Sequence, residues 1–243
     1  MEKRVQILEL ELWTDSIACL DDDYTFPHKL LLGPEKQKGL FSNLPSLRPC
    51  GYSIAPFKSL GVVRFKHVGV TGDAVEFLLS NCPVLERLSL SFAKDLGKLR
   101  VIGPSIALKY LEIKYCLDLR FIEISGANIV SFIYCGPIRD LSLNNVPLLI
   151  EVSIYKWGTF AEFIRLAFSQ LSCCLSHLET LKLDIRKVVS ILIPCYLVEI
   201  KYCRVPYSVV VGFQLYNQNH AFPALSNLKH LELLVDADYS VPW

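Results

Sequence analysis

The sequence predicts an α/β repeat protein in which short parallel strands stack side by side, and three observations indicate this. A spacing of apolar residues, in which the first is followed by others three and five positions later, recurs along the chain. The chain is 52% hydrophobic. Yet its longest nearly unbroken apolar run, residues 188–198, is too short to span a bilayer. Dense, short apolar runs are typical of parallel strands that are buried on both faces.

The recurring pattern indicates a leucine-rich-repeat solenoid with a concave parallel β-sheet, because its first apolar residues lie 19 to 31 residues apart. Each occurrence is predicted to form one strand of that sheet, called here a ladder strand. The expected ladder strands lie near residues 60–65, 85–90, 108–113, 129–134, 149–154, 178–183, 197–202 and 228–233.

The N-terminal part fits the pattern less regularly. Val5, Leu8 and Leu10 match the spacing, but one or two degenerate repeats are expected between them and Leu60. The stretch "LPSLRPC" there carries two prolines where a strand would need backbone amides. We therefore predict a single domain over residues 1–243, with degenerate repeats at 1–59, regular repeats at 60–234 and a tail at 235–243.

The convex side is predicted to mix helix with extended segments. Short repeats leave no room for a helix, and a second series with the same apolar spacing lies between their ladder strands. We expect this series to form extended return strands at 96–101, 119–124 and 138–143. Longer repeats change to helical spacing, which predicts helices near 72–81 and 160–172.

The first helix is defined best. Ala74, Phe77 and Leu78 share one face, and Asn81-Cys82-Pro83 should end the helix because the residue before a proline avoids helical geometry. The later stretch "YSVVVGFQLY" fits either a helix or a strand.

Composition excludes several classes of function. The chain has 25 Lys and Arg against 24 Asp and Glu, so it lacks the charge excess of a nucleic-acid or membrane-surface binder. Its nine cysteines are scattered, with no Cys-x-x-Cys motif, and there is no glycosylation sequon or signal-peptide pattern. These features predict a reduced protein that resides in the cytoplasm, the nucleus or both.

No motif for catalysis, cofactor binding or metal binding is found. The five histidines lie far apart, and the Asp21-Asp22-Asp23 run lacks the glycine and distant glutamate of a calcium loop. No phosphate-binding or nucleophile motif is present. We therefore predict no catalytic, cofactor-binding or metal-binding residues, and a protein that is not an enzyme. Cys116 occupies the repeat position whose side chain usually bonds to a neighbouring repeat, so we expect a structural role.

The concave face is the candidate site, because strand alternation exposes every second residue there. Its mixture of charges with tyrosine, isoleucine and arginine suits protein recognition. The predicted partner-binding residues are Arg64, Arg87, Ser89, Tyr110, Glu112, Lys114, Ser131, Ile133, Glu151, Ser153, Tyr155, Thr180, Lys182, Asp184 and Lys201, with Glu199 and Glu232 on the same face.

An ordered succession of blocks carries a family resemblance. After a helix comes "LLSNCPVLERLSL", followed by "ALKYLEIKYC", "NIVSFIYCGP", "NVPLLIEVSI", "LSHLETLKLDI" and "LSNLKHLELLVDA". Over residues 40–236 the chain resembles the leucine-rich region of plant F-box proteins, including those with an FBD region. The resemblance implies a substrate-recognition region of an adaptor in an SCF-type ubiquitin ligase, which presents a protein target without catalysing transfer.

One departure leaves alternatives open. No stretch matches the helical F-box pattern, so we expect a fragment, a truncated product or an isoform, and binding to a Skp-type adaptor only if an upstream F-box exists. The alternative is a stand-alone leucine-rich-repeat binding module, or a competitor that is not coupled to a ligase. An extracellular receptor domain is disfavoured, because the repeats lack the "L-x-G-x-(I/L)-P" pattern.

Overall fold

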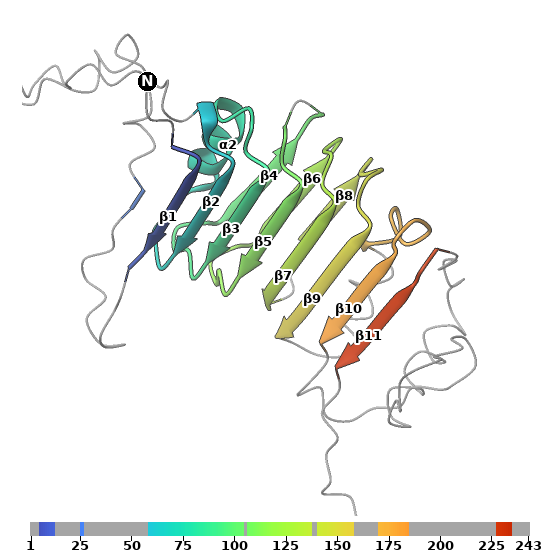
Figure 1. The fold of residues 1–243 in the computed structure, drawn as a ribbon. Coiled ribbons are helices and arrows are strands. Elements are labelled where there is room, and N and C mark those ends of the chain that lie inside the picture. The colour runs from blue at the N-terminus through green and yellow to red at the C-terminus, as the bar shows by residue number, and fades with distance from the viewer. Residues whose placement is uncertain are drawn as a thin grey trace, which may run out of the picture.

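The computed structural model describes residues 5–12, 25–26, 58–104, 106–137, 140–157, 170–184 and 227–234. Its main feature is an eight-stranded sheet in the order β1-β2-β3-β5-β7-β9-β10-β11, in which all neighbours are parallel (Figure 1). Its strands are β1 (Ile7–Glu11), β2 (Val62–Lys66), β3 (Arg87–Ser91), β5 (Tyr110–Lys114), β7 (Ser131–Pro137), β9 (Glu151–Trp157), β10 (Thr180–Asp184) and β11 (His230–Leu234).

A second sheet lies behind the first (Figure 1). It has three parallel strands in the order β4-β6-β8, formed by β4 (Lys98–Ile102), β6 (Phe121–Ser125) and β8 (Asp140–Asn144). These are the three predicted return strands, and the prediction of an extended return path is confirmed. The sequence did not predict that they pair with one another.

The core fills the space between the two sheets. Neighbouring ladder strands pair in phase, so that Leu88, Leu111, Phe132, Val152 and Leu181 form one continuous row across the sheet. All five are buried, as are the inward residues of the return strands, Leu99, Ile122, Leu141, Val101, Ile124 and Leu143. Since every strand contributes to the same apolar layers, each repeat depends on its neighbours for burial.

Helix α2 (Gly72–Asn81) confirms the predicted helix at 72–81. Thr71 is its N-cap, and the Thr71 hydroxyl accepts a hydrogen bond from the Ala74 amide at 3.3 Å. At the other end, the Cys82 amide donates to the Leu78 carbonyl at 2.9 Å.

The buried face of α2 consists of Ala74, Val75, Leu78 and Leu79. The expectation that Phe77 lies on this face is wrong, because Phe77 is only half-buried. The helix begins against β4: a methyl group on Gly72 would lie 2.1 Å from the Lys98 carbonyl oxygen. The inward face is centred between Val75 and Leu78, and at 100° per residue Phe77 lies well away from that centre.

Two predictions about the order of the repeats are wrong. β1 and β2 pair directly. The repeats expected before Leu60 therefore contribute no ladder strand between β1 and β2. Likewise β10 pairs directly with β11, which leaves no place between them for the predicted strand at 197–202. That segment itself, the stretch "YSVVVGFQLY" and most of the predicted helix at 160–172 lie outside the described residues.

Part of the long N-terminal connection covers the core. Thr25 forms a parallel bridge with Gly69, and the Phe26 amide donates to the Gly69 carbonyl at 2.7 Å. The Phe26 ring is buried, with its centroid 4.7 Å from that of Phe65. Phe26 therefore extends the apolar layer beyond the end of β2.

Candidate protein-interaction surface

The outward side of the eight-stranded sheet, called here the ladder face, is the predicted concave face. Strand alternation and the in-phase register arrange its positions in three rows that cross the strands. The first row is Ile7, Val62, Arg87, Tyr110, Ser131, Glu151, Thr180 and His230. The middle row is Glu9, Arg64, Ser89, Glu112, Ile133, Ser153, Lys182 and Glu232. The third row is Glu11, Lys66, Ser91, Lys114, Cys135, Tyr155, Asp184 and Leu234.

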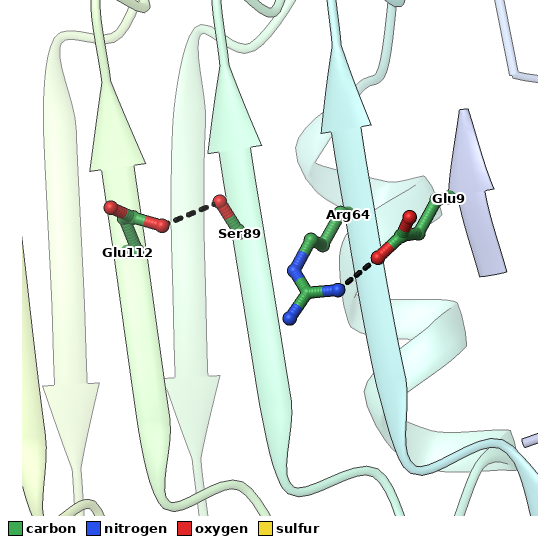
Figure 2. A network of polar contacts seen from close by, with 4 residues as sticks. All are labelled: Glu9, Arg64, Ser89 and Glu112. Carbon is green, nitrogen blue, oxygen red and sulfur yellow. Dashed lines mark hydrogen bonds and ion pairs between the residues drawn. The ribbon is translucent and has the colours of Figure 1, made fainter. Parts of the chain in front are cut away.

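Charged side chains near β2 pair across strands. Arg64 forms an ion pair with Glu9, and Lys66 forms one with Glu11. Figure 2 shows the Arg64–Glu9 pair beside the hydrogen bond that the Ser89 hydroxyl donates to Glu112 at 2.8 Å. The sheet thus holds these polar groups in fixed positions, although exposed pairs of this kind contribute little to stability.

Glu112 is the most constrained carboxylate of the ladder face. Burial by itself raises the pKa of this carboxyl, but the bonds from the Lys114 ammonium and the Ser89 hydroxyl, with the charges of Lys114 and Arg64, hold the pKa below its usual range. The hydrogen bond with Glu112 likewise raises the pKa of Lys114, although partial burial opposes it. Glu112 therefore stays ionised and acts as a fixed acceptor.

Arg87 and Tyr110 form a second kind of contact in the first row. The Arg87 guanidinium carbon lies 3.7 Å from the centre of the Tyr110 ring. This is a cation–π arrangement, which holds the guanidinium plane while its N–H groups stay available to a partner. Arginine and tyrosine are the residues that most often anchor protein interfaces.

Ser131 and Ser153 depart from the prediction of exposed side chains. Their residues are only 4% and 2% exposed. Alternation does place them on the ladder face, but a serine side chain is short and does not rise above neighbours such as Tyr110, Ile133 and Glu151. The larger side chains around them therefore cover the two serines, which offer almost no surface to a partner.

The far end of the ladder face is described in part. The Lys182 ammonium lies 3.5 Å from a Glu232 oxygen, and His230 lies 3.7 Å from the same oxygen. Tyr155 is half-buried in the third row. Lys201 and Glu199 lie outside the described residues, as does the side chain of Asp184.

Buried thiols have structural positions. The Cys116 thiol lies 3.7 Å from the Leu90 carbonyl oxygen of the neighbouring repeat, which confirms its expected role. Burial raises the pKa of Cys116 and of Cys82 to about 11, and that of Cys174 to about 12. These thiols therefore stay protonated at neutral pH and are poor nucleophiles.

Among the described residues, no cluster of three or more His, Cys, Asp or Glu side chains could hold a metal ion. In the same ranges, no helix has the length and apolarity needed to cross a membrane.

An aromatic stack, which sequence reasoning missed, lies where the ladder strands end. His67, Phe92 and Tyr115 directly follow β2, β3 and β5, and all three have positive φ, of 57°, 53° and 56°. The His67 and Phe92 rings stack at 4.5 Å, and those of Phe92 and Tyr115 at 4.7 Å. The sequence does contain a signal for this stack, because an aromatic or histidine ring recurs at the repeat spacing, one residue after each of these three strands.

Parallel ladder strands in phase, with leucine-rich core rows and short return strands, define a leucine-rich-repeat protein. The model of the plant family described as At1g61320/AtMIF1, LRR domain, matches residues 3–231, and the chain belongs to this family. No curated protein and no solved structure matches the chain. A leucine-rich-repeat domain is a protein-interaction module and typically not an enzyme. The match supports the leucine-rich part of the resemblance but not specifically the F-box or FBD type.

Proposed function

We propose that the chain is a protein-recognition solenoid that binds a partner protein through the ladder face, the face that the sequence predicts to be concave. The observation that carries this proposal is the group of half-buried Tyr110, Ile133 and Tyr155 on the same face of the sheet as the charged side chains. Aromatic and aliphatic side chains that are partly exposed provide anchoring contacts, and the surrounding polar side chains give specificity.

The polar groups support the same function because they are preorganised. Glu112 is held by Ser89 and Lys114, and Arg87 is held by Tyr110. A surface whose side chains are already ordered loses less conformational entropy when a partner binds.

Comparative co-purification tests this proposal. The tagged full chain is compared with Ile133→Arg, on the ladder face, and with Phe121→Arg as the matched control. Both residues are half-buried apolar residues at strand positions, but Phe121 belongs to the return sheet. We expect a partner that is retained by Phe121→Arg and lost with Ile133→Arg. Retention of the partner by Ile133→Arg would contradict recognition through the ladder face.

The finer proposal concerns coupling to a ubiquitin ligase. We propose that this recognition region resembles the one in F-box adaptors and delivers its partner only when an F-box is joined to it. The support is the sequence resemblance around "LLSNCPVLERLSL". The second candidate is a stand-alone module or competitor that binds the same partner without delivering it, and the match to a leucine-rich-repeat domain suits this equally well.

A pull-down with a purified Skp-type adaptor tests this coupling. We expect no stoichiometric binding by the chain alone and restored binding when an authentic F-box module is fused to it. Saturable binding by the unfused chain would refute the expectation. If the fused chain binds the adaptor but ubiquitinates no ladder-face partner, the stand-alone function is favoured.

We also propose that the protein works in the cytoplasm or nucleus. The support is that Cys82, Cys116, Cys135 and Cys174 are buried free thiols, which suits a reducing compartment. Fluorescence microscopy of a tagged chain tests this, and a signal confined to the secretory pathway would contradict it.

A further inference from the structure

The charges of the ladder face are largely paired within the sheet. Besides the pairs of Arg64 and Lys66, the Lys114 ammonium pairs with Glu112, and Lys182 pairs with Glu232. The charges just before the strands are paired as well: Lys109 lies 2.6 Å from Glu86, and Lys229 lies 2.7 Å from Glu179. A partner gains little by approaching these groups, because each would have to give up an existing ion pair.

Two charged residues differ from the rest. Among the ladder-face side chains that the structure describes, Arg87 and Glu151 have no ion pair. Arg87 is exposed and rests on Tyr110, and Glu151 is half-buried. A half-buried carboxylate without a cation partner is where a partner's positive charge gains most.

These two residues lie in the same row and have opposite charges. The row runs from Arg87 through Tyr110 and Ser131 to Glu151, on the adjacent strands β3, β5, β7 and β9. Neighbouring strands lie about 4.8 Å apart, so the two charged residues are separated by about 14 Å. Between them are the Tyr110 ring and the buried Ser131.

We propose that this row binds an extended segment of the partner protein that crosses the strands, with an acidic residue at Arg87 and a basic residue at Glu151. This inference rests on the proposed function. An extended chain advances about 3.4 Å per residue, so a separation of about 14 Å corresponds to two residues four positions apart. The segment between them passes over Ser131, where a small or apolar side chain can pack against the Tyr110 ring.

The charges favour this occupant over others. Two opposite charges at a fixed separation recognise a segment with both signs, whereas a nucleic acid or an anionic membrane would need cations alone. The guanidinium of Arg87 can donate two parallel hydrogen bonds to a carboxylate while it remains stacked on Tyr110. Glu151 can accept from an arginine or a lysine in the same way.

A display experiment tests the proposal without knowledge of the natural partner. Random twelve-residue peptides displayed on phage are selected on the purified full chain, and enriched peptides are synthesised and measured by fluorescence anisotropy. We expect enrichment of an acidic and a basic residue four positions apart. Glu151→Lys should weaken these peptides by about ten-fold or more. Replacing the peptide's basic residue by glutamate should restore binding to Glu151→Lys.

Control variants separate the two levels of the proposal. Glu123→Gln, in the return sheet, should bind the peptides as the unmodified chain does. Peptides that lose binding with Ile133→Arg but not with Glu151→Lys would overturn the charged row and leave ladder-face recognition standing. Peptides that respond to neither variant would count against both. Absence of any enriched peptide, or enrichment without spaced opposite charges, would also overturn this inference.

Discussion

Tyr110 and Leu111 are adjacent in the chain, yet they lie on opposite sides of the sheet. Leu111 is 1% exposed and sits in the core row, whereas Tyr110 is half-buried under the Arg87 guanidinium. We expect Leu111→Ala to lower the free energy of unfolding by about 2–5 kcal/mol, because it leaves a cavity between the two sheets. Tyr110→Ala should cost only about 0.5–1 kcal/mol, from the lost cation–π contact.

Denaturant unfolding of the two variants measures this difference. Because Tyr110 belongs to the proposed binding row, Tyr110→Ala should also weaken the selected peptides. Equal destabilisation by the two variants would mean that the register of β5 is wrong by one residue.

Glu112 makes stability depend on pH. Its pKa is lower in the folded chain than in the unfolded chain, so the unfolded state takes up a proton first as the pH falls. The stability contributed by Glu112 is therefore present above pH values of about 4.3, the usual glutamate pKa, and is lost below them. In Glu112→Gln this contribution is absent, and its free energy of unfolding should approach that of the unmodified chain as the pH falls from about 7 to 3.

Urea titrations at several pH values measure this convergence. Arg100 and Glu123 form a half-buried pair in the return sheet at 3.0 Å, so Glu123→Gln serves as the control. A difference in the free energy of unfolding between Glu112→Gln and the unmodified chain that does not change with pH would contradict a lowered pKa of Glu112 in the folded chain.

At the residue scale, the sequence predicts orientation better than exposure. Period-two alternation correctly separates Leu111 from Tyr110, since orientation depends only on strand geometry. Exposure depends also on the size of the neighbours on adjacent strands. The burial of Ser131 and Ser153 follows from the side chains around them, and this could not be predicted without the pairing of β5, β7 and β9.

At the scale of elements, the start of α2 is fixed by its contact with β4. A side chain on Gly72 would bring its Cβ to 2.1 Å from the Lys98 carbonyl oxygen, a backbone atom that cannot move alone. We expect Gly72→Ala to lower the free energy of unfolding by about 1–3 kcal/mol, through displacement of the helix or the strand.

Gly97 provides a matched control for Gly72. It precedes β4, and no heavy atom lies within 4 Å of the position that a Cβ would take. Gly97→Ala should therefore change stability by no more than about 0.5 kcal/mol. Thermal unfolding of both variants decides the matter, and equal effects would show that the helix–strand contact does not constrain Gly72.

The aromatic stack shows what element prediction from sequence omits. Apolar spacing identified the ladder strands, but not the left-handed backbone of His67, Phe92 and Tyr115 that ends three of them. Bulky residues seldom adopt positive φ, so propensity predicts against it. The conformation is set by the neighbouring repeats: the Phe92 amide donates to the Lys114 carbonyl, and the Tyr115 amide donates to the Cys135 carbonyl.

At the scale of the whole molecule, stability should decrease from the centre of the sheet towards its ends. In the described sheet, β5 and β7 have strands on both sides, whereas β1 and β11 each have one. Because each repeat is stabilised mainly by its neighbours, end strands open at lower free energy. We expect amide hydrogen exchange to be slowest for Leu111, Ile113 and Phe132 and fastest for β1 and β11, as measured by mass spectrometry of peptic peptides. Uniform protection across the eight strands would contradict this gradient.

The order of the repeats was predictable only where the spacing is regular. From β2 to β9 the predicted succession of ladder strands holds. The spacing rule predicted the wrong neighbour for β10. An apolar pattern at 197–202 satisfies the rule, but β10 pairs with β11, about fifty residues further along the chain. A spacing rule recognises segments that could form strands, but hydrogen bonding between neighbours decides which segments join the sheet.

The in-phase register has a consequence for inheritance. Leu88 meets Leu111 just as Leu111 meets Phe132, and β4 meets β6 as β6 meets β8. Removing residues 110–130 from the gene would delete one ladder strand with its return strand and place Leu88 opposite Phe132. Both rows would close over the gap, because every surviving strand would meet a partner of the kind it meets now. Such a chain can gain or lose whole repeats in a single genetic event, and an event between β3 and β9 moves Arg87 relative to Glu151 by one strand.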